Sequence, residues 1–199
     1  MLKWKSIEIS AGALLVAAVL YYLDDQGVLF LALAACALHE LGHWWVIHLL
    51  GGRVTALRIT CVGAEMRLSA RYPLGYGRQI AAALAGPAVN LAAAWISAGL
   101  GTETGYCFAG LNLALAAFNL LPAAKLDGGR VLWCVLALLA SPERAESLTR
   151  ALSAALGAGM TAGVAILMWQ GRGNLTLLLT ALWLLAGPAA ERRKKAAAA

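Results

Sequence analysis

The sequence predicts an all-α polytopic membrane protein with about six transmembrane helices and a small membrane-associated β-hairpin after the second. Three observations support this fold class. Hydrophobic residues make up 61% of the 199 residues, and the mean hydropathy is +0.74. Charged residues make up 13%, against about 25% in an ordinary soluble domain. The apolar residues also gather into seven segments, several of them close to the roughly 20 residues that a helix needs to cross a bilayer.

These apolar segments define the expected helices in order along the chain. They are residues 7–23, 28–50, 79–100, 105–121, 128–140, 151–170 and 173–188. Segment 128–140 is too short for a full crossing, so we expect an interfacial helix there and six spans elsewhere. The chain 1–199 then forms a single membrane-embedded domain that ends in a basic tail at 191–199.

Positive charges orient the six spans. In this arrangement Arg172 alone of the 16 Lys and Arg residues falls in an outside loop, whereas Asp24, Asp25 and Glu103 all lie outside. Because Lys and Arg concentrate on the cytoplasmic side, we expect both termini to be cytoplasmic, in what is expected to be a bacterial cell membrane. Topology and contact with anionic lipid account for the net charge of +6, so no nucleic-acid partner is expected.

The region of about residues 53–70, between the second and third spans, has a different pattern. Residues 57–61 and 64–69 alternate apolar and polar side chains around Val62-Gly63. This alternation predicts a short β-hairpin at the membrane surface. Its exposed edge could receive an extended peptide by strand addition, and a purely structural cover for the helices is an equally good interpretation.

The motif with the clearest chemical meaning is His39-Glu40-Leu41-Gly42-His43, which lies inside the second apolar segment. Ionisable residues within a membrane are costly and usually functional. Positions i and i+4 share one face of a helix, so His39 and His43 can bind the same zinc ion. Glu40 lies beside that ion and is free to act as general base. The structural alternative, two histidines bonded to neighbouring helices, leaves Glu40 without a role.

A catalytic zinc site usually has three protein ligands and one open position, so this motif needs a third ligand. Asp127 is the favoured candidate, because the predicted orientation brings it and the two histidines to the inner, cytoplasmic half of the membrane. The other two aspartates, Asp24 and Asp25, lie outside. Asp127 could instead, or in addition, be the N-cap of a helix that begins at Gly128. Three inner-side glutamates outside the spans are alternative ligands: Glu65, Glu143 and Glu146.

Asparagines are the other polar residues of interest within the spans. Ala82, Gly86 and Asn90 recur every four residues, which predicts close helix packing with Asn90 as a cross-helix hydrogen-bonding residue. This interpretation is at least as good as a catalytic one. Asn112 and Asn119 share a face of the fourth span. Asn119 is a candidate catalytic residue that could stabilise an oxyanion or hold substrate backbone, and helix packing is its alternative role.

Three ordered motifs resemble those of the site-2 protease family of intramembrane zinc metalloproteases, and within it those of the stage IV sporulation protein FB group. They are residues 39–43, 85–90 and 119–129, and they mark a catalytic core at about 28–130. Compared with some relatives, the chain is expected to lack a PDZ domain and a nucleotide-sensing CBS domain.

The resemblance implies a single Zn²⁺ ion bound by His39, His43 and Asp127, with Glu40 as the catalytic base. It also implies that the substrates are transmembrane segments of membrane-anchored proteins, with regulatory membrane proteins as further candidate partners. Two other functions stay open at this point. One is a metal transporter or a non-catalytic metal-binding membrane scaffold, and the other is a different protease with a glutamate as third ligand.

Overall fold

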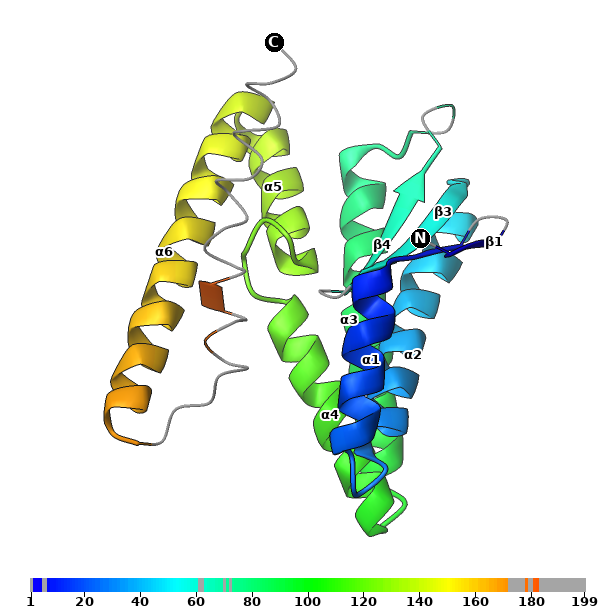
Figure 1. Cartoon of the computed structure of the whole chain (residues 1–199). Helices are drawn as coiled ribbons and strands as arrows, with labels where there is room; N and C mark the ends of the chain where they lie inside the picture. Colours follow the sequence, from blue (N-terminus) through cyan, green and yellow to red (C-terminus); the bar gives the residue numbers. More distant parts are fainter. Residues whose placement is uncertain are drawn as a thin grey trace. The chain divides into compact units, whose positions relative to one another are not determined.

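A computed structural model describes residues 2–4, 7–60, 63–69, 71, 73–171, 178 and 181–182 (Figure 1). The elements within these residues are β1 (Leu2–Trp4), β2 (Ile7–Ile9), α1 (Ala11–Leu23), α2 (Val28–Leu49), β3 (Val54–Thr60), β4 (Gly63–Leu68), α3 (Tyr76–Ala98), α4 (Glu103–Asn119), α5 (Asp127–Leu139) and α6 (Pro142–Trp169). The chain divides into two compact units, residues 1–117 and 118–199.

A four-stranded sheet in the order β1-β2-β3-β4 belongs to the first unit. Strands β3 and β4 pair antiparallel, with Leu57 opposite Met66, at the place where the alternating pattern predicts a hairpin. Strand β2 pairs parallel with β3, with Ile7 opposite Leu57, and antiparallel with β1. The sheet is larger than a hairpin because the beginning of the chain adds two strands to it.

The first predicted span, residues 7–23, is divided between β2 and α1. Helix α1 begins after Ser10, whose Oγ accepts a hydrogen bond from the Ala13 N–H at 3.1 Å. Serine is among the preferred N-caps, because its side chain satisfies a backbone N–H that has no partner within the helix. The helix therefore has only 13 residues, fewer than the roughly 20 of a full crossing.

Three helices in the described part of the chain are long and apolar enough to cross a membrane. They are α2, α3 and α6, with 22, 23 and 28 residues. Helix α4 has 17 residues, which is the lower end of the usual range for a span. The predicted span 173–188 falls almost entirely outside the described residues. The long apolar helices indicate an integral membrane protein, whereas the predicted number of six spans is not confirmed.

Helices α2 and α3 approach each other closely through small residues. A Cβ added to Gly42 would lie 2.8 Å from the carbonyl oxygen of Ala85 and 2.9 Å from the Val89 side chain. Glycine is therefore required at this crossing, as is common where membrane helices bring their backbones together. The close approach places α3 directly beside the two histidines of α2.

The second unit contains α5 and α6, which pack against each other (Figure 1). Helix α5 lies in the segment for which the sequence predicts an interfacial helix. Helix α6 begins earlier than predicted, because Ser141 caps it by accepting from the Arg144 N–H at 3.4 Å. Its first turns are polar and so do not belong to the apolar segment 151–170. The loop before α5 has a small core in which Ala123 and Leu126 are buried.

Candidate active site

Helix α2 carries the His-Glu-x-x-His motif on the side that faces α3. His39 is buried, with 5% of its surface exposed, while Glu40 and His43 are half-buried. The ring centroids of His39 and His43 lie 4.6 Å apart, with an angle of 83° between the ring planes. The i, i+4 spacing thus brings the two imidazoles together, as the sequence predicts.

His39 is oriented by Asn90 of α3. The Nδ1 atom of His39 lies 2.6 Å from Asn90 Oδ1, and Asn90 Nδ2 donates to the Ala35 carbonyl at 3.1 Å and to Asn112 Oδ1 at 2.7 Å. Because the amide nitrogen of Asn90 faces two oxygen acceptors, its own oxygen faces the imidazole. His39 Nδ1 therefore carries the proton and donates it, and the lone pair of the neutral ring is on Nε2.

His43 is oriented by the backbone of α3. Its Nδ1 atom lies 2.7 Å from the carbonyl oxygen of Ala82. A carbonyl oxygen only accepts hydrogen bonds, so the His43 Nδ1 must be the donor. The lone pair of His43 in the neutral imidazole is again on Nε2.

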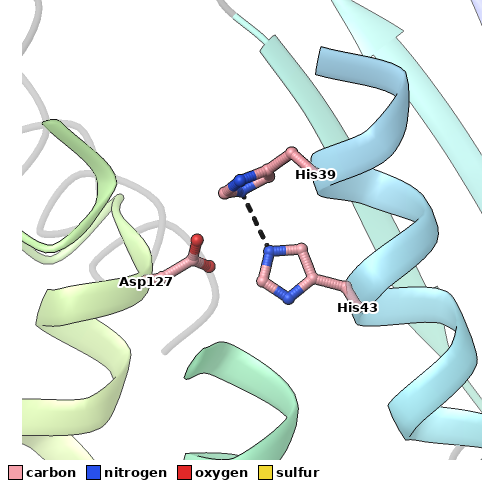
Figure 2. Close-up of side chains that lie close together, drawn as sticks. All are labelled: His39, His43 and Asp127. Atoms are coloured by element: carbon pink, nitrogen blue, oxygen red, sulfur yellow. Dashed lines mark hydrogen bonds between the residues drawn. The ribbon is translucent and has the colours of Figure 1, made fainter. Parts of the chain in front are cut away.

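The two Nε2 atoms face each other at 3.0 Å (Figure 2). Since both neutral rings carry their proton on Nδ1, two lone pairs meet at this point, and a shared cation is what relieves their repulsion. Two nitrogens that each lie about 2.0–2.1 Å from one tetrahedral zinc are roughly 3.3 Å apart. The imidazole pair therefore fits the donor arrangement of a zinc site.

Gly86 of α3 leaves the space in which the two imidazoles lie. A Cβ at this position would overlap Nε2 of His43 and would lie 2.8 Å from Cε1 of His39. The stripe of Ala82, Gly86 and Asn90, which the sequence predicts to be a helix-packing surface, therefore also positions the two histidines. Ala82 accepts from one histidine, Asn90 accepts from the other, and Gly86 makes room for both rings.

Asp127, the first residue of α5, completes a group of three potential metal ligands with the two histidines (Figure 2). One ligand atom from each of His39, His43 and Asp127 lies within 4.8 Å of the others. Two imidazole nitrogens and a carboxylate oxygen form a donor set typical of catalytic zinc, with the fourth position left for water or substrate. The group could thus hold the metal ion that the sequence predicts.

The loop before Asp127 folds tightly onto the beginning of α5. A Cβ at Gly128 would overlap the carbonyl oxygen of Leu120, and one at Gly129 would overlap that of Ala123. The alternative role considered for Asp127, an N-cap, is wrong, because Leu126 occupies the N-cap position and Asp127 lies in the first turn. A carboxylate in the first turn is favoured by the helix dipole.

Ser153 of α6 anchors the same loop. Its Oγ accepts from the Ala124 N–H at 2.7 Å and donates to the Thr149 carbonyl at 2.6 Å. The side chain of Ser153 is buried, with 2% of its surface exposed. A backbone group three residues before Asp127 is thus held by a side chain from the long helix of the second unit.

Comparisons with known proteins agree with this geometry. Residues 99–160 match the model of Peptidase family M50. The chain is 35% identical over 128 residues to Rip3 of Mycobacterium tuberculosis, named as a zinc metalloprotease, in two strains. This match covers 57% of the chain and 32% of Rip3, so the chain spans about a third of the length of these curated relatives.

The fold matches that of the site-2 protease from Methanocaldococcus jannaschii, with a TM-score of 0.74 and 22% identity over 96% of this chain and 93% of that one. The predicted likeness to the site-2 proteases is confirmed. The family match and the relatives support a metalloprotease.

For two residues of this site-2 protease-like chain, the structure supplies partners that the sequence does not name. Asn90 is predicted to be a cross-helix hydrogen-bonding residue, and the structure gives His39 as its partner on α2. Asn112 was linked only to Asn119, and the structure bonds it to Asn90. The available signal was that both are asparagines inside apolar helices, where an amide without a partner is costly.

The remaining candidates lie elsewhere. Asn119 is the half-buried last residue of α4, and its catalytic role stays a prediction. His48 is exposed, and its Nδ1 donates to the Trp44 carbonyl at 3.0 Å, consistent with its interpretation as a surface histidine. Within the described residues, the metal group contains none of the alternative ligands Glu65, Glu143 and Glu146.

Proposed function

We propose that this chain is an intramembrane zinc metalloprotease that cleaves transmembrane segments of membrane-anchored proteins. The observation that carries the proposal is the pair of imidazoles whose Nδ1 atoms both donate, so that both Nε2 lone pairs converge in a group with Asp127. The matches to Peptidase family M50 and to Rip3 support peptide hydrolysis as the chemistry.

The residues have distinct roles in the proposed reaction. His39, His43 and Asp127 would hold one Zn²⁺, which when bound supplies a Lewis acid for the scissile carbonyl and lowers the pKa of a water towards about 7. Glu40 takes a proton from the attacking water and passes it to the leaving amine. Asn119 would donate its amide N–H to the developing oxyanion.

The membrane arrangement is part of the proposal. The distribution of Lys and Arg supports about six spans, with both termini and the active site on the cytoplasmic side. A helical substrate must unwind before its carbonyls can be attacked, because its backbone groups are bonded within the helix. Strand β4 lies at an edge of the sheet, and its outer edge could hold the unwound segment by strand addition.

The decisive experiment compares the wild type with Glu40→Gln, using the full chain in lipid bilayers together with a membrane-embedded test substrate. We expect the wild type to contain one zinc per chain and to cleave the substrate. Glu40→Gln should keep the zinc and cleave at least about 10²-fold more slowly, the usual contribution of a general base. Zinc content and cleavage are measured on the same samples, and Asp127→Ala should lose both.

His48→Gln is the matched control, because His48 lies on the same helix and is exposed. It should behave as the wild type. Equal cleavage by wild type and Glu40→Gln would show that Glu40 is not the base. Zinc binding without cleavage of any substrate tested would favour a metal-binding scaffold, and zinc flux into sealed vesicles would favour a transporter.

A further inference from the structure

Two fully buried asparagines link the metal-binding helix to the helices behind it. Asn90 of α3 and Asn112 of α4 both have 0% of their surface exposed. Asn112 Nδ2 donates to the Phe108 carbonyl at 2.9 Å, Asn112 Oδ1 accepts from Asn90 Nδ2 at 2.7 Å, and Asn90 Oδ1 lies 2.6 Å from His39 Nδ1. A continuous series of hydrogen bonds therefore runs from the backbone of α4 to the imidazole on α2.

The direction of every bond in this series is determined. A backbone carbonyl only accepts, so the Phe108 carbonyl requires the amide nitrogen of Asn112, and the oxygen of Asn112 then faces Asn90. That oxygen in turn requires the nitrogen of Asn90, which leaves the oxygen of Asn90 for His39. The Ala35 carbonyl, 3.1 Å from Asn90 Nδ2, imposes the same orientation independently.

We propose that Asn90 and Asn112 are positioning residues that fix the tautomer of His39, so that its Nε2 is a lone-pair donor before any metal arrives. This inference rests on the proposed metal site and adds how one ligand is prepared for it. His43 needs no such side chain, because the Ala82 carbonyl fixes its tautomer through the backbone. The tautomer of His39 alone therefore depends on side chains that mutation can change.

Packing alone would explain neither residue. An apolar side chain is the cheaper one inside a membrane protein, where a buried amide is costly unless its hydrogen bonds are made. Partners that orient metal-bound histidines typically contribute 10- to 100-fold to metal affinity. A relay to His39 is thus the function that justifies two asparagines at fully buried positions.

The first test measures the tautomer directly. The full chain has three histidines, so selective ¹⁵N labelling and NMR of the metal-stripped protein in nanodiscs can resolve His39, with His39→Gln as assignment control. The pH is kept well above the usual imidazole pKa of about 6.5. We expect the proton of wild-type His39 on Nδ1, and a population shift towards Nε2–H in Asn90→Leu. A wild-type His39 protonated on Nε2 would overturn the relay.

The second test compares Asn90→Leu with Asn90→Asp, using chelator competition to measure zinc affinity. Asp at position 90 keeps an oxygen that can accept from His39 Nδ1 in either protonation state. Affinity should fall about 10- to 100-fold in Asn90→Leu and clearly less in Asn90→Asp. A purely structural asparagine predicts the reverse order, since leucine leaves no polar group to satisfy and a buried carboxylate is costly. That reverse order would contradict the proposal.

Asn112 is tested by its dependence on Asn90. Asn112→Leu should weaken zinc binding less than Asn90→Leu, because the Ala35 carbonyl still orients Asn90. It should have no further effect in the Asn90→Leu background, since residues that act through one another are not additive. Equal effects of Asn112→Leu in both backgrounds would show that Asn112 acts independently of Asn90.

Ser97→Ala is the matched control for both variants. Ser97 is also a buried polar residue of α3, but among the residues that the structure describes its Oγ donates to carbonyls of its own helix alone, Ala93 at 2.7 Å and Ala94 at 3.3 Å. Zinc affinity and the His39 tautomer should stay at wild-type values. If the chain bound no zinc, the proposed protease function would fail, while the tautomer measurement would still decide on the relay.

Discussion

At the scale of single residues, helix α3 supplies the groups that orient the two histidines proposed as metal ligands. Its contributions differ in kind: a side-chain oxygen from Asn90, a backbone oxygen from Ala82, and empty space at Gly86. Each fixes one degree of freedom of an imidazole, whether tautomer or position. Functional sites need this support because ligands misplaced by more than about 0.5 Å lose activity.

Gly86→Ala should abolish the preorganisation of the site with little effect on the rest of the fold. The new Cβ would overlap His43 Nε2 and force both rings to move. We expect zinc affinity to fall at least about tenfold, as it does when other supports of metal ligands are removed. Chelator competition measures the change. Gly110→Ala is the control, because a Cβ at Gly110 meets no atom within 4 Å, and an unchanged affinity in both variants would contradict this account.

The residues of the candidate site differ in how far they could be predicted from the sequence. The histidines and Glu40 follow from local helix geometry, and Asp127 follows from the scarcity of aspartates. The bond between Asn90 and Asn112 joins residues 22 positions apart on different helices, so no local pattern contains it. The carbonyl of Ala82 is invisible in a sequence, because every residue has one.

At the scale of elements, the loop before α5 and the long helix α6 form a unit around the start of α5. The Ala124 N–H donates to Ser153 Oγ, and the loop contributes the buried Ala123 and Leu126. Helix α6 thus holds the backbone at Ala124, three residues before Asp127. A substitution in α6 that weakens this contact should therefore shift the backbone that precedes Asp127, the proposed metal ligand.

Ser153→Ala should destabilise this loop. The substitution leaves the half-buried Ala124 N–H without its acceptor, which costs about 1 kcal/mol, the lower end of the range for unsatisfied groups. We expect a lower midpoint of thermal unfolding and weaker zinc binding. Thr161→Ala is the matched control, because Thr161 also donates to a carbonyl four residues earlier, Gly157 at 2.7 Å. Only Ser153 also accepts from the loop, so equal losses in the two variants would argue against the anchoring role.

Hydropathy did not predict that residues 7–23 divide into a strand and a short helix. Two signals were present: Ile7-Glu8-Ile9 alternates with period two, and Ser10 is a strong N-cap. Neither signal is sufficient to predict the strand, because three residues form a stable strand only when neighbouring strands pair with them. Its partner β3 is about 50 residues away in the sequence, and such pairing has no local signature.

At the scale of the molecule, the distribution of charge predicts which loops lie on each side of the membrane. Glu103 and Glu143 are both exposed and both lie in the first turn of a helix. The predicted orientation places Glu103 outside and Glu143 in the cytoplasm. These two positions therefore form a matched pair for a test of topology.

In a cysteine-free background, a membrane-impermeant maleimide should label Glu103→Cys in intact cells. Glu143→Cys should be labelled only after the membrane is permeabilised. The background replaces four native cysteines: Cys36, Cys61, Cys107 and Cys134. Labelling of both positions from the same side would show that the chain between them does not make the predicted single net crossing, and the six-span arrangement would then be wrong.

Strand β2 is an inner strand, with β1 on one side and β3 on the other. Its three residues extend about 10 Å, and the 13 residues of α1 rise about 20 Å. Together they match the roughly 30 Å thickness of the hydrocarbon core. A chain in lipid needs its backbone groups bonded. Helix α1 bonds most of its groups internally and has Ser10 as its N-cap, and β2 pairs with both neighbouring strands. Residues 7–23 would thus need β1 in order to cross a bilayer, because β1 pairs with the edge of β2 that faces away from β3.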